Sequence, residues 1–207
     1  FLDYFKKLDG FVGRVFDRFL DARGSKESRD QFYMLSDHGF TGIKTEVYLN
    51  RWLQENGYLK FHKDKPESVM DIGQGSKPFA MDPSRIYLNT KEKYPLGTID
   101  ASDFEKVRLE LKEGLEGIIS NEGSKIAKKI YLKEELYKGP YLDQAPDLVI
   151  LSNHGYDLKG KVNTDSIFGR TNLSGMHTQD DAFFFSKSGI ECKSIFDAKR
   201  IILNSLI

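Results

Sequence analysis

The sequence predicts an α/β fold in which a mostly parallel sheet is sandwiched by helices. Stretches with the apolar period of an amphipathic helix alternate with short apolar runs typical of buried strands. This alternation is typical of parallel strands joined by helices. A chain of 207 residues is long enough for one domain with a substantial core. We therefore expect a single α/β domain over residues 1–207, with a loop or insertion at about 62–84.

The first half of the chain is expected to contain two helices and two strands. Apolar residues follow a helical period from Leu2 to Leu20, and "QFYML" after them has the character of a short buried strand. "KTEVYLNRWLQENGYL" reads as a helix that ends at Asn56–Gly57, because glycine tolerates a left-handed cap position. Lys, Pro, Gly, Ser and Asp dominate 62–84, which predicts the loop, and "RIYLN" predicts the next strand.

The second half is expected to alternate helix and strand in the same way. "SDFE" at Ser102–Glu105 matches a capping box, which predicts the start of a helix. "KIAKKIYLKEELY" predicts a strand and then a short polar helix. "DLVILSN" and "DAFFFSKSG" predict buried strands, and "IFDAKRIILNSL" predicts a closing helix. The apolar stripe of the helix after the capping box is formed by Val107, Leu111, Leu115 and Ile118.

Charge and cysteine content exclude several classes of function. Lysine plus arginine and aspartate plus glutamate each number 31, so no global field attracts nucleic acid or an anionic membrane. No apolar stretch approaches the roughly 18 residues of a membrane span. Cys192 is the single cysteine, which excludes an intrachain disulfide framework and a multi-cysteine zinc site. A lone cysteine fits a reducing compartment, so a cytoplasmic location is favoured.

Two similar hexapeptides, "LSDHGF" at Leu35–Phe40 and "LSNHGY" at Leu151–Tyr156, raise the question of one reactive site or two. In the first, Asp37 offers a carboxylate and His38 an imidazole, a ligand pair that suits Zn²⁺ or Mn²⁺. In the second, Asn153 replaces the carboxylate by an amide that ligates transition metals poorly. The sequence therefore favours a metal site in the first copy and a structural turn in the second.

Two other histidines differ in their surroundings. His177 lies in "TNLSGMHTQDDAFFF", just before an apolar strand, where a buried imidazole needs a metal, a carboxylate or a backbone group as its partner. Asp180 and Asp181 could orient His177 from a second shell, or they could form a turn at the start of the strand. His62 lies among lysines and is expected to be exposed to solvent.

Six segments taken together resemble the alkaline phosphatase superfamily, in its type I phosphodiesterase/nucleotide pyrophosphatase branch. They occur in the order of that family through almost the whole chain, and they are "LDGFVGRVFDRFLD", "YMLSDHGF", "VYLNRWLQENGYL", "RIYLNTKEKYPLGTID", "APDLVILSNHGY" and "SGMHTQDDAFFFSKSGI". The resemblance implies an alkaline-phosphatase-like fold with two divalent metal ions, zinc or alternatively manganese. Asp37 and His38 would hold one ion and His177 the other. The implied activity is metal-dependent hydrolysis of a phosphate ester or nucleotide, by in-line attack of a Thr or Ser hydroxyl on phosphorus.

The sequence departs from the family pattern in two respects. It contains no Asp-x-x-x-His pair, and it offers no convincing Thr or Ser nucleophile after an early strand. Family order places both before Phe1. We therefore expect the carboxyl-terminal part of a larger catalytic domain, incomplete at its N-terminus and inactive by itself. Two alternatives remain: a non-catalytic binding or interaction domain that retains the fold, and a sibling resembling the metal-dependent phosphoglycerate mutases or sulfatases.

Overall fold

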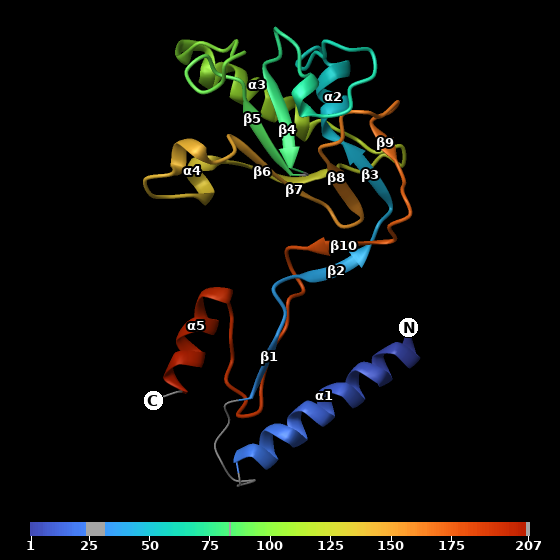
Figure 1. Ribbon diagram of the computed structural model, residues 1–207, viewed down its shortest axis with the longest axis vertical. Helices are drawn as coiled ribbons and strands as arrows, with labels where there is room; N and C mark the ends of the chain where they lie inside the picture. Colours follow the sequence, from blue (N-terminus) through green and yellow to red (C-terminus); the bar gives the residue numbers. More distant parts are fainter. Residues whose placement is uncertain (24–31, 83, 206–207) are drawn as a thin grey trace. The chain divides into compact units, whose positions relative to one another are not determined.

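The computed structural model describes residues 1–23, 32–82 and 84–205, and the chain divides into two compact units (Figure 1). Unit 1 combines Phe1–Phe40 with His177–Ile207, and unit 2 is Thr41–Met176. Strands β2 (Gly39–Gly42) and β10 (Gly175–Thr178) pair with each other. None of the helices in the described ranges is both long and apolar enough to cross a bilayer.

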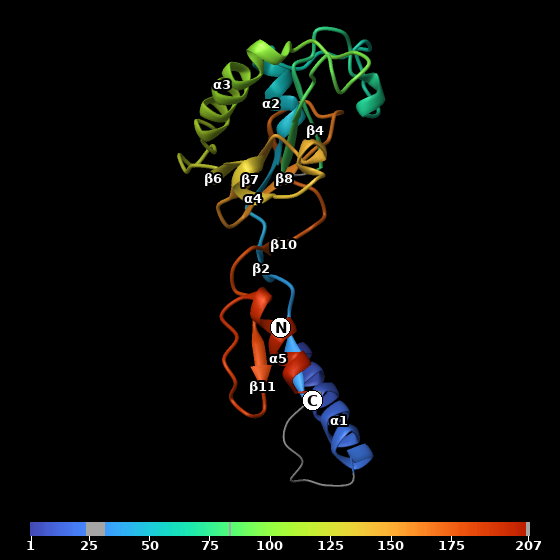
Figure 2. The ribbon, with the colours of Figure 1, turned by 90° about the vertical axis from the view of Figure 1, so that its left-hand side faces the viewer.

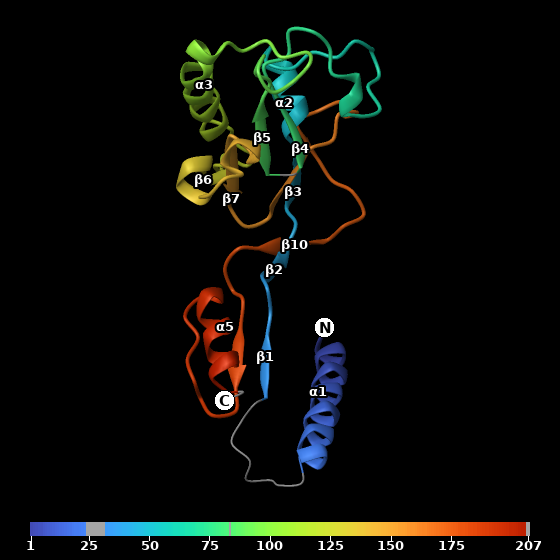
Figure 3. The same ribbon diagram turned by 60° about the vertical axis from the view of Figure 1, so that its left-hand side comes forward.

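Unit 1 consists of a two-stranded ribbon between two helices. Figures 1 and 3 show the helices on opposite sides of the ribbon. The strands are antiparallel, and Met34 lies opposite Phe185. The expected first and last helices and both expected strands form, but the strands are only partly buried instead of buried, since Leu35 and Phe185 are exposed. The elements are α1 (Leu2–Arg23), β1 (Tyr33–Leu35), β11 (Phe184–Ser186) and α5 (Ile195–Asn204).

In the described residues of unit 2, the chain forms two sheets, three α-helices and three short 3₁₀ helices. The larger sheet has the order β4-β5-β7-β6, and the smaller has the order β8-β3-β9. The strands are β3 (Thr45–Tyr48), β4 (Pro78–Asp82), β5 (Arg85–Leu88), β6 (Ala127–Leu132), β7 (Leu148–Ser152), β8 (Tyr156–Lys159) and β9 (Phe168–Gly169). The helices are α2 (Leu49–Glu55), α3 (Phe104–Glu116), α4 (Lys133–Leu136), η1 (Val69–Asp71), η2 (Ala101–Asp103) and η3 (Leu142–Gln144).

The mixed α/β class is confirmed, but the expected mostly parallel sheet is not. Among the described pairings, β3 and β8 are parallel, whereas β1–β11, β3–β9, β4–β5, β5–β7 and β6–β7 are antiparallel. For β4 and β5, the chain connection accounts for the antiparallel pairing. β4 and β5 follow each other almost directly, and so short a connection permits only antiparallel pairing, whereas a parallel pair needs a crossover of a dozen or more residues.

The apolar core of unit 2 lies between its helices and its sheets. α3 contacts β6, while α2 contacts β4 and β8 (Figure 2). Trp52 packs so closely on α3 that a β-carbon added to Gly114 would lie 2.9 Å from its ring. The apolar stripe predicted for α3 is confirmed, since all four of its residues are buried. The largest fully buried side chains are Leu49, Leu53, Leu59, Ile86, Leu88, Leu111, Leu115, Ile126, Ile130 and Leu148.

Two local predictions are wrong. Thr45–Tyr48 was expected to begin a helix but forms β3, because this segment pairs with strands on both of its sides and buries Val47 completely. Tertiary pairing here overrides a helical pattern that continues correctly into α2. The prediction of a capping box at Ser102–Glu105 is also wrong. η2 precedes α3, and the cap residue Asp103 makes no side-chain cap hydrogen bond.

The end of α2 agrees with the prediction from the sequence, whereas the segment 62–84 contains more secondary structure than was predicted. Asn56 caps α2, and Gly57 follows with φ of 75°, the left-handed position expected for this helix end. The segment 62–84 was expected to be a loop, but it contains η1 and strand β4. In that segment the Asp71 carboxylate accepts a hydrogen bond from the Glu67 N–H and pairs with Lys63 at 2.8 Å.

Candidate metal centre

The residues predicted to bind metal lie on the two segments next to the paired strands β1 and β11 of unit 1: one segment comes after β1, and the other comes before β11. Asp37 and His38 lie at the bend between β1 and β2, and His177 lies on β10. Two hydrogen bonds of 3.0 Å tie the start of this bend to the other strand. Ser36 N–H donates to the Phe183 carbonyl, and Phe183 N–H donates to Ser36 Oγ. The ribbon therefore fixes the backbone from which Asp37 projects.

The structure brings His38 and His177 into direct contact. Their imidazole rings stack with centroids 3.9 Å apart and planes inclined by 20°. The ring of Phe40 also lies near His177, with ring centroids 5.9 Å apart. Two imidazoles from opposite parts of the sequence thus form one polar cluster inside unit 1.

The hydrogen bond of His38 determines which of its nitrogens can bind a metal. Nδ1 lies 2.8 Å from the carbonyl oxygen of Gly39. A carbonyl only accepts hydrogen bonds, so Nδ1 carries the proton and the neutral ring leaves its lone pair on Nε2. A backbone carbonyl that orients a metal-binding histidine in this way is a common arrangement.

Asp37 lies on the side of His38 where that lone pair is found. Its Oδ1 is 3.4 Å from His38 Nε2, and its side chain is 87% exposed. Two ligand atoms about 2.05 Å from one zinc ion in tetrahedral geometry would be about 3.3 Å apart. The Asp37–His38 spacing therefore fits a shared cation. The same spacing also fits an imidazolium–carboxylate contact when Nε2 is protonated.

A cavity of about 360 Å³ adjoins Asp37 within unit 1. Its lining combines the carboxylates of Asp37, Asp180 and Asp181 with Lys193 and apolar side chains that include Phe183. Cys192, the single cysteine, also lines this cavity, and its Sγ donates a hydrogen bond to the Ser194 carbonyl. The cavity supplies space for a small ligand beside the first candidate metal ligand.

Asp180 and Asp181 lie in a turn that follows β10. Thr178 Oγ1 donates to the Asp180 carbonyl at 2.7 Å, and Asp181 adopts φ of 66°. The turn therefore has a definite conformation that involves the backbone of both aspartates. The orientation of His177 by one of their carboxylates stays a prediction.

The second hexapeptide forms the turn that its sequence predicts. β7 ends at Ser152, β8 begins at Tyr156, and Gly155 between them has φ of 90°. Asn153 uses its side-chain amide to donate to the Lys125 carbonyl at 2.9 Å. The structural interpretation of this copy is confirmed for Asn153 and Gly155, and His154 lies exposed in the same turn.

His62 is exposed to solvent, as predicted. Its Nε2 lies 3.5 Å from the Asp71 carboxylate, which also pairs with Lys63. The hydrogen bond from Lys63, followed by that from the Glu67 N–H, lowers the pKa of Asp71 to about 2. Asp71 accordingly anchors the segment around η1.

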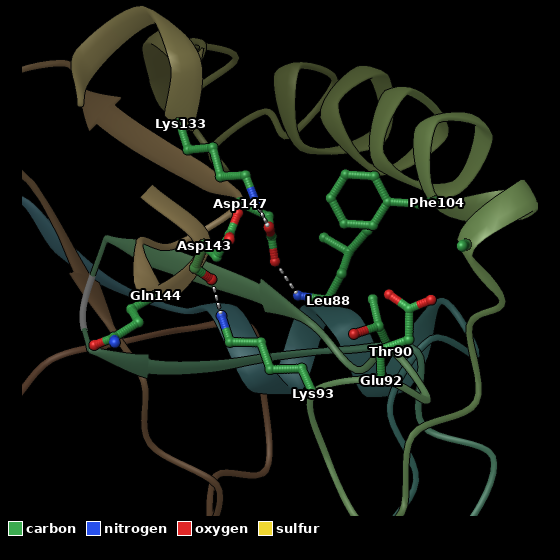
Figure 4. A pocket seen from close by; sticks show the side chains of 10 residues that line it. Leu88, Thr90, Glu92, Lys93, Phe104, Lys133, Asp143, Gln144 and Asp147 are labelled. Atoms are coloured by element: carbon green, nitrogen blue, oxygen red, sulfur yellow. Dashed lines mark hydrogen bonds and ion pairs between the residues drawn. The ribbon is translucent and has the colours of Figure 1, made fainter. Parts of the chain in front are cut away.

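A larger cavity of about 540 Å³ lies in unit 2 (Figure 4). Three of its charged groups already have partners within the protein. Asp147, which is buried, binds Lys133 at 3.0 Å and accepts the Leu88 N–H at 2.8 Å, and Lys93 donates to the Asp143 carbonyl at 2.9 Å. No histidine or cysteine lines it among the described residues. It is therefore a weaker candidate for metal chemistry than the cluster in unit 1.

Sequence analysis also missed the buried carboxylate of Glu46 on β3. The Tyr48 hydroxyl donates to Glu46 Oε2 at 2.8 Å, Thr171 donates to Oε1, and Lys161 Nζ lies 3.8 Å from Oε2. Burial alone would raise the pKa of Glu46, but the hydrogen bonds from Thr171 and Tyr48 lower it below its ordinary value. Burial and the adjacent carboxylate raise the pKa of Tyr48 to about 12. This network could have been identified if Thr45–Tyr48 had been assigned from the sequence as a strand.

Comparison with known proteins gives one match. A family model described as "Type I phosphodiesterase / nucleotide pyrophosphatase" matches residues 1–180, which include Asp37, His38 and His177. Comparisons with curated proteins and with solved structures each gave no match.

Proposed function

Because the chain belongs to the type I phosphodiesterase/nucleotide pyrophosphatase family, we propose that it contributes a two-metal centre to the hydrolysis of phosphate esters. In this proposal Asp37 and His38 hold one divalent ion and His177 holds the other. Zinc suits the mixed nitrogen and oxygen donors best, and manganese is the alternative. The substrate would be a phosphate monoester, a phosphodiester or a nucleotide.

The observation that carries the proposal is the contact between His38 and His177. Their centroid separation of 3.9 Å resembles the ~3.5–4 Å between the ions of two-metal hydrolytic sites. Adjacent, nearly parallel rings could therefore direct one nitrogen each toward neighbouring ions. The proton on His38 Nδ1 supports this arrangement, because it leaves Nε2 available beside Asp37.

The chain's own residues would have three tasks. Asp37 and His38 would fix the position of one charge, and His177 would fix that of a second. The cavity beside Asp37 would receive the ester group and limit the access of water. Bound zinc would stabilise charge on the phosphoryl oxygens and lower the pKa of an attacking hydroxyl or water. The nucleophile and the other ligands of such a site have no assigned residues in this sequence.

Zinc titration of the metal-free chain by calorimetry tests the proposal. We expect Asp37→Ala, His38→Ala and His177→Ala each to weaken or abolish zinc binding. His62→Ala is the matched control, because His62 also contacts a carboxylate but lies in unit 2, and it should bind zinc as the wild type does. If the three site variants bind zinc like the control, the metal assignment is wrong. In that case a non-catalytic binding domain becomes the better interpretation.

A further inference from the structure

The turn after β10 contains an unusual backbone conformation beside a candidate metal ligand. Asp181, with φ of 66°, is the one non-glycine residue with positive φ in the described part of the chain. Side chains with a β-carbon rarely adopt this region, although aspartate and asparagine tolerate it better than others. Such conformations persist where the surrounding structure enforces them, and they are frequent at functional sites.

This turn brings the Asp180 backbone against Gly39. A β-carbon added to Gly39 would overlap the Asp180 carbonyl oxygen and Thr178 Oγ1, and it would lie 2.8 Å from the β-carbon of Asp181. Thr178 is buried, and its hydroxyl donates to that same carbonyl at 2.7 Å. A glycine is therefore required at position 39 by close approach and not by its φ angle.

The two sides of this contact are joined directly to the candidate ligands. Gly39 follows His38, and its carbonyl also accepts the His38 Nδ1 proton. Thr178 follows His177 on β10. Any displacement of Gly39 from the turn would therefore change both the orientation of His38 and its distance from His177.

We infer that Gly39, Thr178 and Asp181 form a backbone clamp that positions His38 against His177 and thereby sets the affinity of the site for metal. Asp181 contributes through its left-handed backbone conformation and not through its carboxylate. This inference rests on the proposed function, because it concerns the same metal ligands. Preorganised ligands bind more tightly since less conformational freedom is lost on binding.

Three substitutions of Asp181 separate the backbone role from a carboxylate role. Asp181→Asn removes the charge but tolerates positive φ, Asp181→Gly removes the side chain and favours positive φ, and Asp181→Val strongly disfavours it. The zinc dissociation constant is measured by competition with a chromophoric chelator. We expect Asn and Gly variants to bind like the wild type, and the Val variant to bind about tenfold more weakly. The visible spectrum of bound Co²⁺ should change only in the Val variant.

Gly39→Ala tests the other side of the clamp. We expect zinc affinity to fall by about tenfold or more, because the added methyl group must separate Gly39 from the turn. Gly57→Ala is the matched control, since Gly57 has φ of 75° and nothing lies within 4 Å of its added β-carbon. It should lower thermal stability without changing zinc affinity.

The possible outcomes are distinguishable. If Asp181→Asn binds zinc as weakly as Asp181→Val, the carboxylate is responsible and the clamp is wrong. Wild-type affinity in Gly39→Ala would also overturn it. If Gly39→Ala does not fold, the Asp181 series still decides the question. If Asp37→Ala, His38→Ala and His177→Ala all retain wild-type zinc binding, the failure lies with the proposed function.

Discussion

His38 and His177 stack with their ring centroids 3.9 Å apart, although one lies before the whole of unit 2 in the sequence and the other after it. His38 lies between β1 and β2, and His177 lies on β10. The antiparallel pairing of β1 with β11 and the pairing of β2 with β10 hold these two segments together. The fold therefore brings together two imidazoles that are far apart in the sequence, and the Asp37 carboxylate lies beside the first of them. Four predictions follow from this arrangement and from the core that supports unit 2.

Zinc binding should stabilise unit 1 locally. A ligand that binds the native state at 100 times its dissociation constant stabilises that state by about 2.7 kcal/mol. We expect zinc to slow hydrogen exchange of the β1 and β11 amides, and a chelator to reverse the effect. Amides of β6 and β7 provide the internal comparison and should keep their exchange rates. Uniform slowing in both units would indicate nonspecific stabilisation instead of binding at Asp37, His38 and His177.

The isolated chain should bind zinc without efficient catalysis. It carries three of the ligands implied by the family resemblance, and its sequence provides neither an Asp-x-x-x-His pair nor an assigned nucleophile. With bis(p-nitrophenyl) phosphate and zinc, we expect turnover far below the ~1 s⁻¹ at the lower end of ordinary enzymes. Turnover at or above that rate would show that the remaining catalytic groups lie within these 207 residues.

Leu111 should be essential to the core of unit 2. Its side chain is completely buried on α3, so Leu111→Ala leaves a cavity. We expect the free energy of unfolding to fall by about 2–5 kcal/mol in urea denaturation. Leu109 lies on the same helix and is 54% exposed, so Leu109→Ala should change it by less than about 0.5 kcal/mol. Equal effects of the two changes would contradict the orientation of α3.

Glu46 should make unit 2 sensitive to acid. Its pKa is lower in the folded state than its ordinary value of 4.5, so the folded state binds fewer protons than the unfolded state. The stabilisation from ionised Glu46 is therefore present above pH 4.5 and is lost as the pH falls through the folded-state pKa. We expect Glu46→Gln to lower stability at pH 7 and to flatten its acid dependence.

A pH series of urea midpoints measures this effect. Glu110 lies exposed on α3, so Glu110→Gln should keep the acid dependence of the wild type. If Glu46→Gln shows the same slope below pH 4.5 as that control, the hydrogen bonds from Tyr48 and Thr171 do not determine the ionisation of Glu46.

The sequence predicted the elements whose signals are local. The helical period of α3 and the apolar run of β7 specify their conformations without help from distant residues. Strand β3 was misassigned, because its pairing with β8 and β9 depends on segments far along the chain. The short strands β2, β9 and β10 lack a clear alternation of their own and were not predicted. Strand direction likewise depends on connections that periodicity does not reveal.

For the candidate metal centre, the sequence identified candidate ligands, whose binding of metal stays a prediction, but not how they are arranged. Asp37 and His38 were recognised as an adjacent carboxylate and imidazole, and His177 as a histidine that needs a partner. Their contact could not be predicted from the residues, since it depends on how β2 pairs with β10. The clamp around Gly39 was also hidden, because it depends on a close backbone approach.

Anomalous diffraction at the zinc absorption edge, from crystals of the chain grown with Zn²⁺, tests the metal assignment most directly. We predict one peak within about 2.2 Å of both His38 Nε2 and an Asp37 carboxylate oxygen, and a second peak at a ring nitrogen of His177. Zinc bound only elsewhere on the chain, or a map in which the His38 and His177 rings face apart without metal between them, would contradict the account.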